Sequence, residues 1–345
     1  MAPPLVLDLG NSLMRLGYTG QSHPKHAIAT RSVSADLFPY GSDSQFNLEG
    51  YTAALDRALT ATSTKLSRQP LCLVHSVACT DTDRENLAEL AFETHRTPAM
   101  YLANDSVTAL YSMGRVSGIV VDVGFRHTRT VAVHEGFALP ASLQVDNAGG
   151  KHVTQFLQTA LSERGHKLTE ATCDAIKLKH ARCAVQYGAE TRRARDLPLR
   201  KNVVTLPDGT LVDMTDDLLR CAEVVLRPSF AGVASQGIVA SVDAVMRACY
   251  DHGQSPELHS VPSFVLAVGG SSRIAQLGPR LQHDVDQLQR SVGGCVVSCL
   301  TEEERQHAAW IGGSLVSSLP EFFEEQAITA QEYAEVGKAV VLDRC

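Results

Sequence analysis

Two stretches of the chain repeat one pattern of apolar and polar positions. They are LVLDLGNSLMRLGYTG (5–20) and IVVDVGFRHTRTVAVHEG (119–136). Each contains an apolar run, an aspartate, an apolar residue, a glycine, a short turn, a second apolar run and a further glycine. This pattern predicts a strand, a tight turn and a returning strand. Two such hairpins, more than 100 residues apart, indicate two related lobes.

Between and after the hairpins, strand-like segments alternate with helical ones, which is typical of an α/β protein. An N-cap at Thr80 or Asp81 precedes apolar residues at helical spacing. The Asp-Gly pair at 208–209 predicts the tip of a second kind of hairpin within 206–214. The other predicted elements are a helix at 105–114 ended by Gly114, a helix at 149–165 ended by Gly165, and a strand at Phe264–Val268 followed by a Gly-Gly turn and a helix.

Composition restricts the class of protein. The chain has 345 residues, 44% of them hydrophobic and 20% charged, which is enough for two lobes with substantial cores. Its formal net charge of −7 argues against a general nucleic-acid binder. We expect no membrane span and no signal peptide, because apolar runs are short and Asp8 interrupts the first one. Nine cysteines, mostly in apolar segments, suggest reduced, buried thiols.

The hairpin tips carry candidate chemistry. An aspartate and a glycine at such a tip suggest a nucleotide site. The backbone amides would bind a phosphate, and the carboxylate would bind the metal ion. The Gly-Gly turn at 269–270 would offer further amides. The alternative is that each glycine merely serves a turn. Pattern alone leaves both interpretations open, and the bulky Phe125, Arg126 and His127 disfavour a phosphate loop at the second tip.

Longer segments resemble actin and the actin-related proteins, in order and over nearly the whole chain. They are ELAFETHRTPAMYLANDSVTALYSMGR (89–115), EGFALPASLQVDNAGGKHVTQFL (135–157), TLPDGTLVDM, LRPSFAG, VGGSSR, AAWIGGSLVSSL and AQEYAEVGKAVVLDRC. The resemblance implies an actin-like ATPase fold: two related, ribonuclease H-like lobes around a central nucleotide cleft. The implied outer lobe is 1–112 plus 308–345, the inner lobe is 113–147 plus 234–307, and 148–233 is a smaller subdomain of the inner lobe.

The resemblance also assigns a site for ATP or ADP with magnesium. Asp8 and Asp122 would hold the metal through water. The implied nucleotide contacts are Asp8, Gly10, Asn11, Ser12, Leu13 and Arg15 in the first hairpin, Asp122, Gly124 and Arg126 in the second, and Lys177, Gly269, Gly270 and Ser271 beyond it.

Several positions depart from the actin pattern. Phe125 and Arg126 stand where actin has an aspartate and a glycine, which removes a carboxylate and adds bulk near the phosphates. Arg126 would compensate only by pairing directly with a phosphate. Asp105 and Arg129 replace the glutamine and histidine that place the attacking water, and we interpret Asp105 as the N-cap of its helix. Around the base and ribose, the altered positions are Asp174, Leu178 and Gln306.

Two further features bear on assembly. The stretch 27–69 is much shorter than the corresponding actin segment, with room for a strand or two but not for the second subdomain and its polymerisation loop. Five residues match the apolar groove in which partner helices dock on actin: Tyr111, Gly114, Leu315, Val316 and Leu319. The alternative for the last three is one core face of a helix.

From these features we expect a pseudo-ATPase that acts as a structural subunit of a multi-subunit cytoskeletal assembly. Axonemal dynein (hence a flagellar location) and a dynactin-like complex are the leading candidates. We expect cytoplasmic location, docking through an amphipathic helix in the groove, residual ATP binding at most, and no homopolymer. The alternatives are a nuclear chromatin-remodelling subunit, an active polymerising actin, and a sugar or metabolite kinase of the wider superfamily.

Overall fold

The computed structural model of the chain describes residues 2–30, 47–196, 203–251, 256–288, 296–299 and 302–344. The chain divides into two compact units. The first unit contains residues 1–118, 133–140 and 307–345, and the second contains 119–132 and 141–306. The segment 148–233 lies within the second unit, and its standing as a separate subdomain stays a prediction. The part of the chain that the structure describes has no helix long and apolar enough to cross a membrane.

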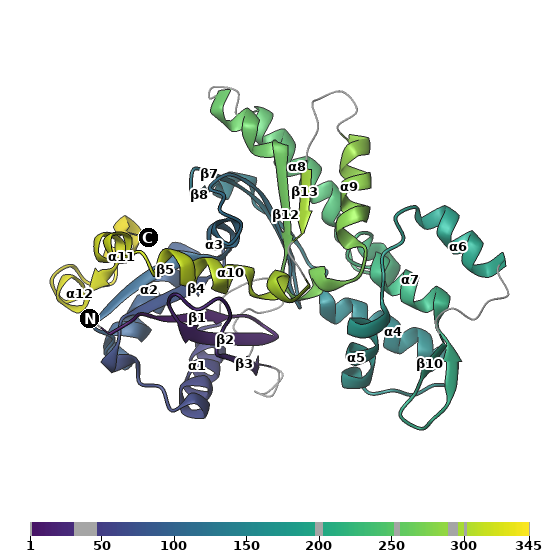
Figure 1. The fold of residues 1–345 in the computed structure, drawn as a ribbon, viewed down its shortest axis with the longest axis horizontal. Helices are drawn as coiled ribbons and strands as arrows, with labels where there is room; N and C mark the ends of the chain where they lie inside the picture. The colour runs from purple at the N-terminus through teal and green to yellow at the C-terminus, as the bar shows by residue number, and fades with distance from the viewer. Residues whose placement is uncertain are drawn as a thin grey trace. The chain divides into compact units, whose positions relative to one another are not determined.

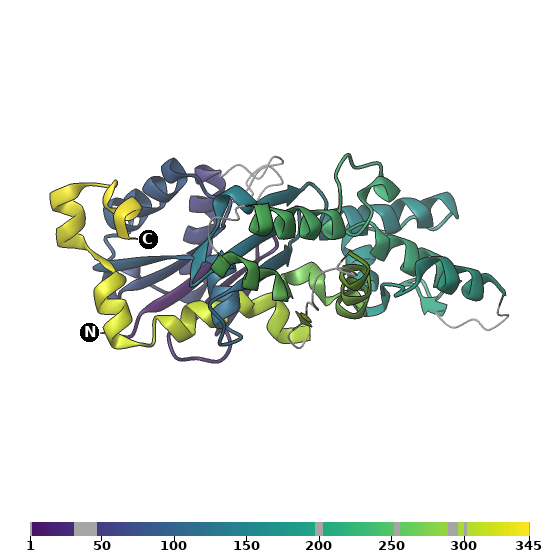
Figure 2. The same ribbon diagram turned by 90° about the horizontal axis from the view of Figure 1, so that it is seen from above.

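The first unit is built on a six-stranded sheet in the order β14-β5-β4-β1-β2-β3. Strands β1, β4 and β5 run parallel, whereas β2 returns antiparallel to β1. The N-terminal strands and the C-terminal helices of this unit lie together (Figures 1 and 2), and the indole N–H of Trp310 donates to the carbonyl of Val6 at 3.0 Å. The strands are β1 Leu5–Leu9, β2 Leu13–Tyr18, β3 His26–Ala29, β4 Leu71–His75, β5 Ala99–Asn104 and β14 Ile328–Thr329.

Helices with an apolar face cover this sheet. α2 begins after Thr80, whose hydroxyl accepts from the amide of Asp83; of the two predicted N-caps, Thr80 and Asp81, the structure has Thr80. α1 was not predicted, although its buried residues Tyr51, Ala54, Leu55, Ala58 and Leu59 follow helical spacing. The helices are α1 Leu48–Thr62, α2 Asp81–Glu89, α3 Asp105–Tyr111, α10 Glu302–Val316, α11 Pro320–Gln326, α12 Ala330–Val336 and α13 Val340–Arg344.

The shortened stretch 27–69 therefore contains the end of β3, the helix α1 and the short turn Leu66–Arg68. Residues 31–46 lie outside the described residues, so the expected absence of a polymerisation loop stays a prediction. The strand β3 pairs with β2, and α1 contributes its apolar face to the core of the first unit.

The second sheet repeats the plan of the first. Its order is β13-β12-β6-β7-β8, with β9 also paired to β7. In each sheet the first hairpin strand pairs in parallel with a later strand, which pairs in parallel with the next: β1-β4-β5 and β6-β12-β13. This shared plan confirms the predicted α/β fold with two related halves. The strands are β6 Gly118–Val123, β7 Thr128–His134, β8 Phe137–Ala138, β9 Gln144–Asp146, β12 Phe264–Val268 and β13 Val296–Cys299.

Helices and one small hairpin complete the second unit. The predicted hairpin at 206–214 is confirmed, because β10 and β11 pair antiparallel across Asp208 and Gly209. α9 begins seven residues later than the Gly-Gly turn suggested, after the 3₁₀ turn Gly270–Arg273. The bounds are α4 Gly150–Glu163, α5 Glu170–His180, α6 Tyr187–Asp196, β10 Val203–Thr205, β11 Leu211–Asp213, α7 Thr215–Glu223, α8 Ile238–Asp251 and α9 Leu277–Leu288.

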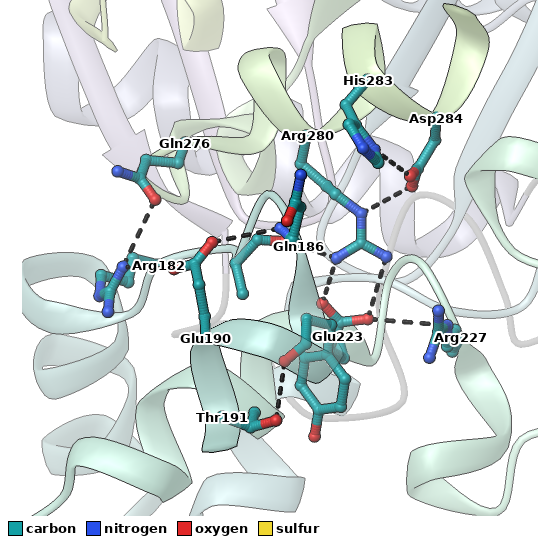
Figure 3. Close-up of polar contacts among 12 residues, drawn as sticks. Arg182, Gln186, Glu190, Thr191, Glu223, Arg227, Gln276, Arg280, His283 and Asp284 are labelled. Carbon is teal, nitrogen blue, oxygen red and sulfur yellow. Dashed lines mark hydrogen bonds and ion pairs between the residues drawn. The ribbon is translucent and has the colours of Figure 1, made fainter. Parts of the chain in front are cut away.

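A buried ionic network joins helices of the second unit (Figure 3). Arg280 of α9 donates to Glu223 of α7 at 2.6 Å and to the carbonyl of Ala184 at 2.6 Å. Its Nε donates to Asp284 at 2.7 Å. The side chains of Arg280 and Glu223 are 4% and 0% exposed, so removing one partner would leave a buried charge uncompensated. We interpret this network as structural.

Candidate nucleotide-site hairpins

The first hairpin pairs its aspartate with an arginine of its own. Asp8 on β1 lies directly opposite Arg15 on β2 in the antiparallel register. Arg15 Nη1 donates to Asp8 Oδ2 at 2.8 Å, and the two side chains are 10% and 15% exposed. Arg15 Nε donates to Nδ1 of His307 at 2.9 Å. The strand register therefore places Arg15 against Asp8, the carboxylate that the resemblance predicts to hold the metal.

The tip of the first hairpin is tight and small. The amide of Gly10 donates to the carbonyl of Leu13 at 3.0 Å, and a Cβ at Gly10 would lie 2.9 Å from that oxygen. Thr30 donates from its amide to Ser12 O at 3.0 Å and from its hydroxyl to Gly10 O at 2.8 Å. Asn11 is buried. The glycine is therefore explained by the turn itself.

The second hairpin reproduces this geometry. The amide of Gly124 donates to the carbonyl of His127 at 3.0 Å, and a Cβ at Gly124 would lie 2.9 Å from that oxygen. Arg129 Nη1 donates to Asp122 Oδ2 at 3.2 Å. The arginine again follows the aspartate by seven residues. Both members of the repeat thus hold their aspartate with an internal arginine.

The second tip differs because other elements pack onto it. Its carbonyls accept hydrogen bonds from the start of α4: Gly150 N donates to Gly124 O at 3.0 Å, and Lys151 N donates to Phe125 O at 2.7 Å. A Cβ at Gly149 would lie within 2.9 Å of three backbone atoms of this tip. Phe125 is only 9% exposed. These α4 amides are engaged by the tip of the hairpin.

Basic groups gather beside the same tip. His152 Nδ1 accepts from Gly149 N at 3.2 Å. Burial lowers the pKa of His152, and the nearby Lys151 and Arg126 lower it further. Partial burial also lowers the pKa of Arg126. The second tip is therefore a place where added positive charge is unfavourable.

The Gly-Gly turn closes over Asp122. Gly269 has a φ of +91°, and a Cβ there would collide with Asp122 Oδ1. Its amide donates to the carbonyl of Arg305 at 2.9 Å. Ser271 Oγ donates to Gly124 O at 2.9 Å. Gly270, by contrast, has open space where a Cβ would lie. Three residues of this turn were predicted to contact nucleotide. Two of them, Gly269 and Ser271, instead pack against or bond to the second hairpin.

Lys177 is buried, and its ammonium group donates hydrogen bonds to three protein oxygens. Its Nζ donates to Gly150 O at 3.0 Å, to Thr154 Oγ1 at 2.9 Å and to Asp174 Oδ1 at 2.6 Å. An ammonium group has three N–H donors, and these three oxygens use them all. Asp174, which replaces a base or ribose contact in the resemblance, here neutralises the lysine.

The remaining altered positions also have protein neighbours or face solvent. The N-cap prediction for Asp105 was wrong by one residue, because Asn104 caps α3 and accepts from the amides of Ser106 and Val107. Asp105 instead accepts from the amide of Val77 at 2.9 Å, which joins α3 to the loop after β4. Gln306 accepts from Arg273 at 2.9 Å, and Leu178 is 51% exposed.

These groups do not fit a magnesium nucleotide in the way the resemblance implied. Water-mediated Mg²⁺ binding requires carboxylates that are available to the hydrated ion, whereas Asp8 and Asp122 each have an arginine at ion-pair distance. In the described part of the chain, no three His, Cys, Asp or Glu side chains converge as a metal site. The lysine and the serine predicted to contact nucleotide are bonded to protein oxygens.

The groove residues lie in the first unit on α3, α10 and the loops that follow them. Leu315 and Leu319 are 48% and 56% exposed. Val316 is only 7% exposed, so this position belongs to the core, as the helix-face alternative proposed. Gly114 has a φ of +65° after α3, which explains this glycine through the turn. Tyr111 lies close to Gly136, where a Cβ would lie 2.6 Å from its hydroxyl.

Two exposed apolar residues beside Gly136, which lies next to Tyr111, were missed. Val116 and Phe137 are 54% and 76% exposed, and the amide of Gly136 donates to the carbonyl of Val116 at 2.7 Å. α10 packs on α3 so tightly that a Cβ at Gly312 would collide with the backbone of Thr108. We call Tyr111, Val116, Phe137, Leu315 and Leu319 the apolar surface. Phe137, which directly follows the final glycine of the second hairpin, was the sequence feature that could have indicated these exposed apolar residues.

Other unpredicted residues hold the hairpins or Lys177 in place: His307, Gly149, Gly150 and Thr154. Only the paired glycines at the start of the predicted helix 149–165 carried a sequence signal.

The comparisons with known proteins agree with this architecture. The sequence model of the actin family matches residues 46–345. A curated relative from Dictyostelium discoideum, named "Putative actin-29", is 31% identical over 279 residues, which cover 76% of this chain and 68% of the relative.

Proposed function

The chain belongs to the actin family, and we propose that it acts as a non-polymerising structural subunit of a larger cytoskeletal assembly that does not turn over ATP. The observation that carries the proposal is the arginine on each hairpin carboxylate. Hydrolysis of ATP requires a bound metal ion. The metal bridges phosphate oxygens and neutralises the negative charge that develops on them. Carboxylates already neutralised by arginine attract such a metal far less.

Two replaced residues, Arg129 of the second hairpin and Asp105 at the start of α3, support the same conclusion. Arginine stays protonated at neutral pH and cannot serve as a base, so Arg129 cannot activate water. Its guanidinium is also engaged with Asp122. Asp105 binds the amide of Val77, which gives this carboxylate a role in the fold. Both side chains have partners within the protein, which supports a role in the fold rather than in placing an attacking water.

The apolar surface supports a role in binding another protein. Five apolar or aromatic residues from α3, α10 and the segments next to them contribute to it, and the exposed ones would lose unfavourable contact with water on binding. A partner with an amphipathic helix fits an apolar strip of this kind. We propose that this surface docks a helix of a neighbouring subunit, and an axonemal dynein or dynactin-like complex is the assembly we favour.

The experiment is an affinity purification of the tagged chain, followed by identification of stoichiometric companions. We expect cytoskeletal subunits, and we expect Leu319→Asp to reduce their recovery at least about tenfold because a buried carboxylate would oppose docking. Val336→Asp is the matched control, since Val336 is equally exposed (59%) on α12. Recovery of chromatin-remodelling subunits would replace the cytoskeletal assignment, and sedimentation of the pure protein as filaments with Mg·ATP would refute the proposal.

A further inference from the structure

The helix α6 carries basic residues in a chain that is acidic overall. The formal net charge of the chain is −7, whereas the segment YGAETRRARDLPLRK (187–201) contains more basic than acidic residues. Within the described part of this segment, which is the helix Tyr187–Asp196, the side chains of Arg192 and Arg193 are exposed. Two adjacent guanidinium groups therefore lie on the surface of the second unit.

These two arginines differ from the arginines of the helices that follow. On α7, α8 and α9, Arg220, Arg247 and Arg280 each pair with an acidic residue four positions away on the same helix. Among the described side chains, Arg192 and Arg193 make no such ion pair. The acidic residue nearest to them in the chain, Glu190, instead pairs with Arg182 at 3.2 Å. The two exposed guanidinium groups are therefore available to a ligand.

The buried ionic network holds the start of α6 in place (Figure 3). Glu190 accepts from the amide of Gln186 at 3.2 Å. The guanidinium of Arg227 lies 5.7 Å from the centre of the Tyr187 ring and 3.8 Å from the buried carboxylate of Glu223. Arginines on a fixed helix lose less backbone freedom on binding than arginines on an unstructured loop. The network therefore gives the exposed arginines of α6 a defined position.

Three kinds of anionic partner use exposed arginines, and other features of the chain distinguish them. A nucleic-acid binder normally has a basic domain, whereas the net charge of this chain is −7. A helix that lies on a membrane exposes large apolar side chains beside its basic ones, and α6 exposes none among its described residues. A carboxylate-rich protein segment requires neither feature, because one guanidinium binds one carboxylate through two parallel hydrogen bonds.

We infer that Arg192 and Arg193 form a docking surface for an acidic segment of a partner protein. The inference goes beyond the proposed function, because it adds a contact on the second unit that depends neither on the hairpins nor on the apolar surface. A segment rich in glutamate or aspartate has the matching chemistry, and the acidic net charge of the chain disfavours its binding elsewhere. Because both arginines are exposed, the contact weakens as the salt concentration rises.

The experiment is a titration of a fluorescein-labelled glutamate decapeptide with the purified full chain at low ionic strength, followed by fluorescence anisotropy. We expect the wild type to bind with a Kd on the order of micromolar, and Arg192→Ala combined with Arg193→Ala to weaken binding at least about tenfold. Arg192→Lys combined with Arg193→Lys keeps the charge but loses the paired hydrogen bonds, so we expect a loss of about threefold.

The matched control is Arg57→Ala combined with Arg68→Ala. It removes two exposed arginines from the first unit, and we expect it to leave the affinity for the peptide unchanged. All substituted side chains are exposed, so we expect every variant to fold, which circular dichroism checks.

Three outcomes would overturn the inference. They are no binding of the peptide by the wild type, an equal loss of affinity in the control variant, and tighter binding of a DNA duplex or of phosphatidylserine vesicles than of the peptide through the same two arginines. The last outcome would assign the surface to nucleic acid or to a membrane. None of these measurements reports phosphate release or docking on the apolar surface, so failure of this inference and failure of the proposed function are distinguishable.

Discussion

The two hairpins have the same backbone but different surroundings. In both, a glycine amide closes the turn and an arginine holds the aspartate. The first tip carries the small residues Asn11 and Ser12 and is held by Thr30. The second tip carries Phe125 and is covered by α4 and by the turn at Gly269.

This contrast separates residues kept for folding from residues kept for a ligand. The glycines and aspartates are explained by turns, close approaches and ion pairs within the protein. The difference predicts how each hairpin responds to substitution.

The largest effect is expected at the turn that covers Asp122. Gly269→Ala introduces a Cβ at a positive φ and against Asp122 Oδ1, so we expect a loss of about 3 kcal/mol in the free energy of unfolding. Gly270→Ala is the matched control, because nothing lies within 4 Å of its Cβ position. Urea unfolding followed by circular dichroism measures both, and equal stability of the two variants would contradict the packing described for the second tip.

A smaller loss is expected on removing either arginine. Arg15→Met and Arg129→Met each remove the ion-pair partner of a shielded carboxylate, which we expect to cost about 1–3 kcal/mol. The Arg15 variant should lose more, since its ion pair is shorter (2.8 against 3.2 Å) and Asp8 is less exposed than Asp122. Hydrogen exchange of 5–18 and of 118–134 assigns each loss to its hairpin. Unchanged exchange in the altered hairpin would mean that its ion pair does not stabilise it.

Mild acid should affect the sheet of the first hairpin. His75 ends β4, next to Val74, which pairs with Asp8. Burial lowers the pKa of His75 to about 4. Because the unfolded state binds the proton more readily, stability is complete above about pH 6.5 and falls as the pH drops toward 4, by about 2 kcal/mol at pH 5.

The fluorescence of Trp310, the single tryptophan and a buried residue of the first unit, reports this loss during urea unfolding at pH 7.5 and pH 5. His75→Gln should reduce the difference between the two pH values. A variant that retains the full pH dependence would assign the effect to other groups.

The sequence was most informative where backbone geometry requires a particular residue. Asp8 with Gly10 and Asp122 with Gly124 predicted both hairpins, and the N-cap expected at Thr80 or Asp81 predicted the start of α2 to within one residue. It was less informative about side-chain partners. The spacing of Asp8 and Arg15 could have indicated their pairing, but only the strand register places them face to face. The burial of Lys177 and Val316 depends on helices that are distant in sequence.

The helix α1 and the N-cap Asn104 were missed for a different reason. The stretch 27–69, which contains α1, was expected to hold a strand or two, although Tyr51 to Leu59 carry a helical pattern. At α3, adjacent Asn and Asp are both good caps, and the choice is decided by the contact of Asp105 with the loop after β4.

The central claim is that the hairpins no longer support turnover of a magnesium nucleotide. Its most direct test is phosphate release by the purified chain with Mg·ATP, measured together with the nucleotide that co-purifies. We predict no release above the protein-free rate at any protein concentration. Sustained release that increases with protein concentration, with ADP retained by the protein, would contradict the account.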